Sequence, residues 1–413
     1  MVKKALIKHS PLMPKKALNL HPIRDISLYV FTAELYNKSR DDIAIFIFPK
    51  NSSVAEVFTK SSLRSSTLDW NEKALKQKKI SALFINSGNA NTFTGKEGRK
   101  AIQKIIKKIE ELFFVSSKNV FIASTGVIGE PFPIKDVINA ISSTSVICKD
   151  WNKAAKAIMT TDTFPKGISV NSKVENKKIY ITGISKGSGM VEPNMATILG
   201  FILTDIDLDS TMLNKLLKQN IDDTFNAISV DGDESTNDTV FLISSRSIKF
   251  KKKIKSINDT RLKDFKIKLK KVFKDLSEQI VRDGEGATKL IEVNVSKSRS
   301  KFEAKTIAKS IANSPLVKTA IHGSDPNWGR IIMAIGKTYF KINEKKLKIK
   351  FGRYLLTKNG KVNSSINEKN LKSYLKKYKV SINVDLALGK ESAKVITCDF
   401  SKKYIDINAS YKS

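Results

Sequence analysis

The chain has 413 residues, 41% of them hydrophobic and 28% charged, so disorder of the whole chain is excluded. There are 74 lysines and arginines against 40 acidic residues, a net charge of +34. The length predicts two domains, and two cysteines, Cys148 and Cys398, are too few for a disulfide framework.

The first third of the sequence predicts alternating strands and helices. Short apolar runs predict strands at 43–48, 81–85 and 120–123, and apolar residues at three- and four-residue spacing predict a helix around 102–112. The last two strands lead into turn-rich stretches of small and polar residues, where polar groups are available for chemistry.

The middle third continues the same alternation. A strand is expected at 178–184, before a glycine-rich turn, and another at 239–244. Ser210 is expected to cap a helix whose apolar positions are Leu213, Leu217, Ile221 and Phe225. A long amphipathic helix is predicted at 261–282.

From Leu290 the pattern changes to more strands. Strands are expected at 290–295, 347–351, 379–386 and 393–398, a helix at 302–313, and a hairpin turn at Asn359-Gly360. We predict a boundary at 296, with an α/β core over 1–296 and a smaller C-terminal α/β domain over 297–413.

The net charge raises the question of nucleic-acid binding, because lysine and arginine neutralise phosphates. The chain has 64 lysines but only 10 arginines, the residue that dominates base readout. The lysines of 263–274 recur at helical spacing between apolar residues, a pattern typical of a solvated helix face. A basic nucleic-acid-binding protein is therefore the less favoured alternative.

Membrane insertion, secretion and metal chemistry find no support in the sequence. No apolar run reaches the ~18–20 residues of a membrane span, and residues 1–16 lack the apolar core of a signal peptide, so a cytoplasmic protein is expected. The three histidines and two cysteines form no metal-binding motif. The acidic stretch 231–235 lacks the later glycine and glutamate of a calcium loop.

A serine hydrolase is one reading of the residues. Gly183–Gly187 matches the nucleophile-elbow pattern around Ser185, and His322 is the one histidine that follows it in the chain. Ser185 continues a strand instead of opening a helix, which disfavours this reading. Ser124–Gly129 offers a different site, since small residues after a strand can present backbone N–H groups to an oxyanion.

Eight motifs in order make the chain resemble the ornithine acetyltransferase (glutamate N-acetyltransferase) family of arginine biosynthesis. They are Asn86–Asn91, Ser124–Gly129, Met159–Thr163, Lys186–Leu199, Ser229–Thr239, Asp283–Lys289, His322–Arg330 and Asn408–Ser413. The first 80 residues resemble the family only loosely, chiefly at Val57–Thr59.

The resemblance implies a fold and a processing step. The fold is a layered α/β sandwich of the L-aminopeptidase/D-esterase kind, similar to N-terminal-nucleophile hydrolases, with a smaller C-terminal α/β domain. The precursor would cleave itself between Ala196 and Thr197, giving an α chain (1–196) and a β chain (197–413) that pair as α2β2. The freed α-amino group, with an ordinary pKa of ~7.7–8.0, is a suitable base for the Thr197 hydroxyl.

The resemblance also implies the reaction. Thr197 would accept acetyl from N-acetylornithine and pass it to glutamate, with acetyl-CoA as an alternative donor in bifunctional members and no metal or cofactor. The oxyanion-hole pair matches Thr125 and Gly126, and the substrate-contacting positions match Thr160, Lys186, Thr197, Glu285, Asn408 and Ser413. Thr161 and Thr163 are alternatives to Thr160.

On charge grounds, we expect Lys186 to face a substrate carboxylate and Glu285 a substrate ammonium. The rival on the same scaffold is an amidohydrolase or aminopeptidase that uses Thr197 but gives the acyl group to water.

Overall fold

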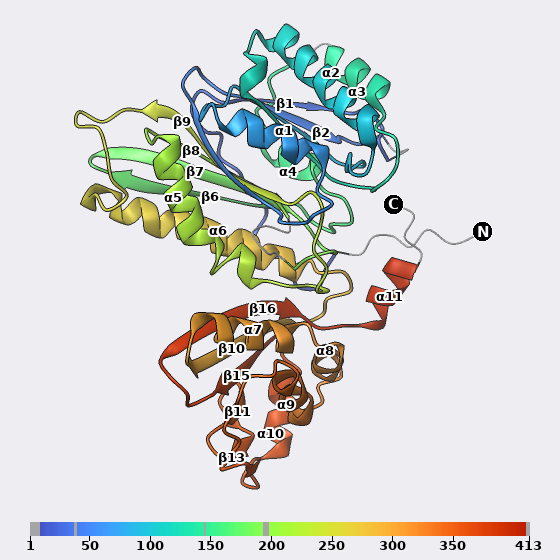
Figure 1. Cartoon of the computed structure of the whole chain (residues 1–413), viewed down its shortest axis with the longest axis vertical. Helices are drawn as coiled ribbons and strands as arrows, with labels where there is room; N and C mark the ends of the chain where they lie inside the picture. The colour runs from blue at the N-terminus through green and yellow to red at the C-terminus, as the bar shows by residue number, and fades with distance from the viewer. Residues whose placement is uncertain (1–8, 37–38, 144–145, 193–197, 410–413) are drawn as a thin grey trace.

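Two sheets stacked face to face make up the larger part of the molecule (Figure 1). The computed structural model describes residues 9–36, 39–143, 146–192 and 198–409. The first sheet has the order β1-β2-β4-β5 and the second β3-β9-β8-β7-β6. Their strands are β1 (Ser27–Phe31), β2 (Ile43–Ile47), β4 (Ala82–Asn86), β5 (Val120–Ser124), β3 (Ser53–Phe58), β9 (Thr239–Ile248), β8 (Leu199–Ile206), β7 (Lys177–Lys186) and β6 (Lys166–Val174).

Helices cover the outer face of each sheet. In Figure 1, α2 (Gly95–Phe113) and α3 (Ile134–Ser142) lie on the first sheet, and α5 (Ser210–Ile221) and α6 (Lys263–Arg282) on the second. Helix α1 (Ser66–Leu75) packs against β3 and β5, and α4 (Asn152–Ala157) packs against β1, β2 and β7. The result is a four-layered α/β/β/α sandwich with mixed sheets, which confirms the expected fold class.

The burial of β2 shows why its sequence is an unbroken apolar run. Ile43 and Ile45 face the core under α2 and α3, while Ala44 and Phe46 face the core between the two sheets. A strand buried on both faces has no solvent side on which polar residues would alternate.

A third sheet forms the lower part of the molecule in Figure 1. Its order is β12-β11-β15-β10-β16, with helices α7 to α10 beside it. The elements are β10 (Leu290–Ser298), α7 (Lys301–Ala312), α8 (Pro315–His322), α9 (Trp328–Gly336), β11 (Lys348–Phe351), β12 (Tyr354–Leu355), α10 (Glu368–Leu375), β15 (Lys379–Asp385) and β16 (Glu391–Cys398). Residue 296 lies within β10, which pairs with both β15 and β16. The division of the chain into two domains at 296 stays a prediction.

A short hairpin and a final helix complete this part of the molecule. The predicted hairpin at Asn359-Gly360 joins β13 (Thr357–Lys358) to β14 (Lys361–Val362), which confirms it. After β16 the chain forms α11 (Lys402–Ala409), which returns toward the sandwich (Figure 1).

Some local expectations need correction. Ser210 does not cap α5: Asp209 does, its Oδ1 accepting the Met212 N–H at 3.0 Å, because the carboxylate one residue earlier reaches the free N–H group. Phe225 lies beyond α5, in a short 3₁₀ turn (Phe225–Ala227), although it is buried as expected. Of the six lysines predicted to form a solvated face of α6, those at 263, 270, 271 and 274 are exposed, and Lys266 and Lys268 are half-buried.

Candidate active site

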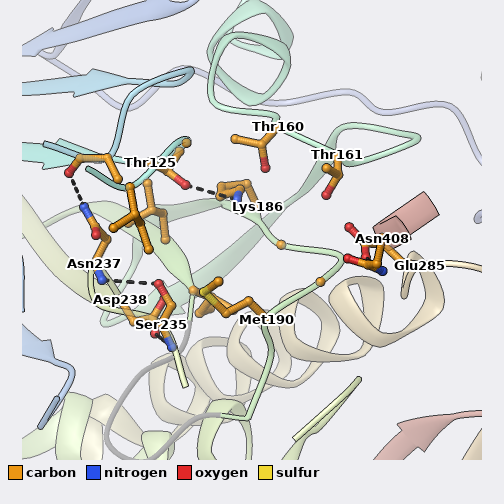
Figure 2. Close-up of a pocket in the computed structure, with 17 residues that line it drawn as sticks. Thr125, Thr160, Thr161, Lys186, Met190, Ser235, Asn237, Asp238, Glu285 and Asn408 are labelled. Carbon is orange, nitrogen blue, oxygen red and sulfur yellow. Dashed lines mark hydrogen bonds between the residues drawn. The ribbon is translucent and has the colours of Figure 1, made fainter. Parts of the chain in front are cut away.

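A pocket of about 180 Å³ lies where the two sheets of the sandwich meet the turn after α6 and helix α11 (Figure 2). It brings together six of the residues expected from the sequence: Thr125, Gly126, Thr160, Lys186, Glu285 and Asn408. Ala196, Thr197 and Ser413 lie outside the described residues. Ile198 and Leu199, which follow Thr197 in the chain, also line the pocket.

Gly126 occupies a position where any added side chain would clash with the backbone. Its φ is +135°, and an added Cβ would lie 2.2 Å from the carbonyl carbon of Gly88 and 2.5 Å from the nitrogen of Asn89. The preceding Thr125 is fixed by its N–H, which donates to the Asn86 carbonyl at 3.0 Å. The Gly126 N–H has no hydrogen bond to a described residue, and Gly126 lines the pocket.

Lys186, the last residue of β7, reaches across to Thr125. Its Nζ donates to Thr125 Oγ1 at 3.2 Å, as the dashed line in Figure 2 marks. An ammonium can only donate, so the hydroxyl oxygen accepts and its own proton stays free to donate elsewhere. Burial lowers the pKa of Lys186, while the nearby Asp162 acts in the opposite direction.

Glu285 follows α6 and meets the C-terminal helix α11. Asn408 Nδ2 donates to Glu285 Oε2 at 2.8 Å, so helix α11 reaches the pocket. Glu285 is 7% exposed, and burial raises its pKa although hydrogen bonds from Asn408 and Thr161 partly oppose this. A carboxylate kept largely from water gains from a cationic ligand group.

The three candidate threonines at 160, 161 and 163 have different environments. Thr160 and Thr161 line the pocket, and the Thr160 N–H donates to Asp162 Oδ2 at 2.9 Å. Thr161 Oγ1 bonds to Ser188 Oγ at 2.6 Å. Thr163 instead bonds to Asp283 through both its N–H and its hydroxyl, away from the pocket lining.

Sequence reasoning missed Asp238, which lines the pocket beside Ser235 (Figure 2). It is 4% exposed, and burial raises its pKa well above the ordinary value, while a hydrogen bond from Ser235 and the charge of Lys186 oppose this. Its neighbour Asn237 donates to the carbonyls of Ala90 and Ser124 and so ties the two sheets together. The available signal was the polar motif 229–239, in which no single residue had been assigned a role.

The structure gives no support to the serine-hydrolase interpretation of Ser185 and His322. The Ser185 hydroxyl is buried in β7 and has no hydrogen-bond partner among the described residues, while His322 bonds to Asp399 at 2.7 Å. Within the described ranges, no group of three His, Cys, Asp or Glu residues is arranged to hold a metal ion. None of the helices in those ranges is long and apolar enough to cross a membrane.

Comparison with known proteins gives one consistent family. The model of the ArgJ family matches residues 28–413. The arginine biosynthesis bifunctional protein ArgJ of Bradyrhizobium diazoefficiens is 41% identical over 408 residues, covering 98% of this chain and 99% of that protein. The ArgJ protein of Agrobacterium fabrum is 40% identical with the same coverage.

Solved structures give partial matches. The crystal structure of arginine biosynthesis bifunctional protein ArgJ from Bacillus halodurans is 39% identical, with a TM-score of 0.49, and covers 52% of this chain and 100% of that one. The L-aminopeptidase D-Ala-esterase/amidase of Ochrobactrum anthropi is 10% identical, with a TM-score of 0.40, and covers 64% of this chain and 85% of that one.

Proposed function

Since the chain belongs to the ArgJ family of bifunctional arginine-biosynthesis enzymes, we propose that it moves acetyl from N-acetylornithine to glutamate through an acetyl-threonine enzyme. The family match confirms the resemblance seen in the sequence motifs. In this proposal Thr197, freed by self-cleavage after Ala196, is the nucleophile and its α-amino group the base.

The observation that carries the proposal is the pair of donors at Thr125 and Gly126. Thr125, whose hydroxyl accepts from Lys186 at 3.2 Å, and Gly126 line one pocket, and we assign the second donor to the Gly126 N–H. When the Thr197 hydroxyl attacks the acetyl carbonyl, the oxygen becomes negative, and these two donors stabilise it. Ornithine leaves with the proton that the α-amino group took from the Thr197 hydroxyl. The neutral glutamate amine then attacks the acetyl-enzyme under the same two donors, the bond from acetyl to the Thr197 oxygen breaks, and the amine proton returns through the α-amino group to that oxygen as acetylglutamate leaves.

The charges around the pocket support substrate orientation. Lys186 is the cation among the described lining residues, and Asp238 and Glu285 are the carboxylates. We place the α-carboxylate of N-acetylornithine toward Lys186 and its δ-ammonium toward Glu285. Thr160 contacts the substrate from the turn before β6, and Asn408 and Ser413 contact it from the C-terminal tail.

The strand order supports the proposed two-chain mature enzyme. Strands β3, β6 and β7 belong to the α chain (1–196) and β8 and β9 to the β chain (197–413), yet all five form one sheet. The chains therefore stay together after cleavage, and we propose that two such pairs form an α2β2 assembly in the cytoplasm. Acetyl-CoA is the proposed second donor, since the curated relatives are named as bifunctional proteins.

Intact mass measurement of the purified protein tests this function. Wild type should give two fragments, one ending at Ala196 and one beginning at Thr197, and Thr197→Ala should stay whole. An uncleaved, fully active wild type would refute the proposal. A second assay supplies N-acetylornithine with and without glutamate: acetylglutamate formation supports the transferase, and acetate release that ignores glutamate identifies a hydrolase.

A further inference from the structure

Lys166 lies at the start of β6 with its ammonium sealed inside the protein. Its Nζ donates to Asp162 Oδ1 at 2.5 Å and to Asp283 Oδ2 at 2.6 Å, and the three side chains have no exposed surface. None of the three lines the pocket. Among the described residues, Lys166 is the ion-pair partner found for both carboxylates.

The first carboxylate, Asp162, joins two pocket segments. Its Oδ2 accepts the Thr160 N–H at 2.9 Å, and its Oδ1 accepts the Gly187 N–H at 2.8 Å. Gly187 directly follows Lys186, so Asp162 fixes the spacing between Thr160 and the strand end that carries Lys186. Burial alone would raise the pKa of Asp162, but Lys166 and Lys186 outweigh burial and hold it below its usual range.

The second carboxylate, Asp283, lies two residues before Glu285. It accepts the Thr163 N–H at 2.9 Å and the Thr163 hydroxyl at 2.5 Å, which ties the end of α6 to the segment of Thr160. From there the Glu285 N–H donates to the Ser188 carbonyl at 2.9 Å. The three segments that carry Thr160, Lys186 and Glu285 thus meet at the two carboxylates.

We propose that Lys166 is a positioning residue of the acetyl transfer, which holds the segments of Thr160, Lys186 and Glu285 in the geometry that binds N-acetylornithine. Without the Lys166 ammonium, the buried carboxylates of Asp162 and Asp283 would repel each other. This repulsion would push apart the segments to which the two carboxylates are bonded. This inference rests on the proposed function, because it assigns those three residues to substrate.

The test compares Lys166→Met with Lys318→Met. Lys318 is equally buried, but its Nζ donates to Thr397 Oγ1 at 2.8 Å and to the Cys398 carbonyl, not to a carboxylate. Both substitutions remove a buried ammonium and keep similar volume. Kinetic constants are measured per active site, counted by the burst of ornithine released from N-acetylornithine without glutamate.

Lys166→Met should lower kcat/KM for N-acetylornithine about 100-fold per active site, mostly through KM, since displacements near 1 Å are this costly. Lys318→Met should lower Tm and leave both constants unchanged. Wild-type kcat and KM per active site in Lys166→Met would overturn the proposal, whatever its Tm.

If Lys166→Met yields no folded, processed chain, Asp162→Asn is tested in its place. This substitution keeps the side-chain volume and removes the negative charge of the carboxylate that accepts from the Thr160 and Gly187 N–H groups. A raised KM supports the proposal, and a wild-type KM overturns it. The proposed function is tested first on wild type. A wild-type chain that releases no ornithine from N-acetylornithine refutes both the proposed function and the role of Lys166. Transfer of the acetyl group to water instead of glutamate refutes the transferase alone and leaves the Lys166 comparison valid.

Discussion

The ammonium of Lys186 donates to the hydroxyl of Thr125 across 3.2 Å, although the two residues are 61 positions apart and lie at the ends of strands in different sheets. Thr125 follows β5 in the first sheet, and Lys186 closes β7 in the second. The contact therefore depends on the packing between the sheets, where Phe121, Phe201 and Phe241 are buried. One of the two proposed oxyanion donors is oriented by the layer opposite its own.

Removal of the Thr125 hydroxyl is the direct test of this arrangement. Thr125→Ala should lower kcat about 100- to 1,000-fold, the usual loss for one oxyanion donor. Thr125→Ser keeps the hydroxyl and should stay within about tenfold of wild type. Single-turnover measurement of ornithine release checks both, and equal losses in the two variants would show that the hydroxyl does not act on the oxyanion.

The role of Lys186 can be separated from that of Thr125 by a double-mutant cycle. Because its ammonium acts partly through the Thr125 hydroxyl, Lys186→Met should cost less when Thr125 is already alanine. We expect the combined loss in kcat to fall short of the product of the single losses by at least about tenfold. Fully multiplicative losses would show that Lys186 acts only on substrate.

Glu285 should give the enzyme an acid-dependent substrate affinity. Its charged form is the one that attracts an ammonium, and burial raises its pKa above the ordinary 4.5, so kcat/KM for N-acetylornithine should fall as pH drops through that raised value. Glu285→Gln should lose about 2 kcal/mol of binding, roughly 30-fold in kcat/KM, and lose this pH dependence.

The pH profiles of Glu285→Gln and wild type have to be compared, because burial also raises the pKa of Asp238, which lines the same pocket. Any acid dependence that remains in Glu285→Gln belongs to other groups, Asp238 among them. A pH profile identical in wild type and Glu285→Gln would contradict the assignment of Glu285 to the substrate ammonium.

Gly126 offers a stability test with a matched control. Gly126 and Gly129 both have positive φ, but an added Cβ meets backbone atoms at 2.2 Å at Gly126 and nothing within 4 Å at Gly129. Gly126→Ala should therefore lower the free energy of unfolding by about 1–3 kcal/mol more than Gly129→Ala. Denaturant titration measures both, and equal losses would mean that Gly88 and Asn89 move aside without cost.

The features that can be predicted from the sequence are those that depend on residues close together in the chain. The apolar run 120–123 predicts the strand that the structure extends to Ser124, and the motif directly after the run contains Gly126. The helix cap at Asp209 was misplaced by one residue, because serine and aspartate both cap helices and only geometry selects between them.

What could not be predicted depends on long-range packing. Lys166 and Asp283 are 117 residues apart, and no pattern in the sequence indicates that they share a buried ion pair. Asp238 belongs to a recognisable polar motif, but its place in the pocket depends on how β9 lies beside β8. The pairing of His322 with Asp399 likewise joins residues 77 positions apart.

The strand order of the second sheet predicts that the two proposed chains stay associated after cleavage. In the order β3-β9-β8-β7-β6, the proposed β chain contributes the adjacent strands β8 and β9, and the proposed α chain flanks them with β7 on one side and β3 on the other. Both junctions are strand pairings with buried apolar residues on either face, such as Ile202 and Leu203. Among the described residues, no ion pair joins β3 to β9 or β7 to β8.

The cleaved chains should therefore elute together in native gel filtration, in 1 M NaCl as in low salt, because salt screens surface charges but not apolar burial or backbone hydrogen bonds. They should separate only in denaturant. The α chain expressed alone should be insoluble, since it lacks β8 and β9, which lie between its strands β7 and β3, and coexpression with the β chain should restore a soluble complex. Elution of two separate fragments in native buffer would contradict the sheet order on which the mature two-chain enzyme is proposed.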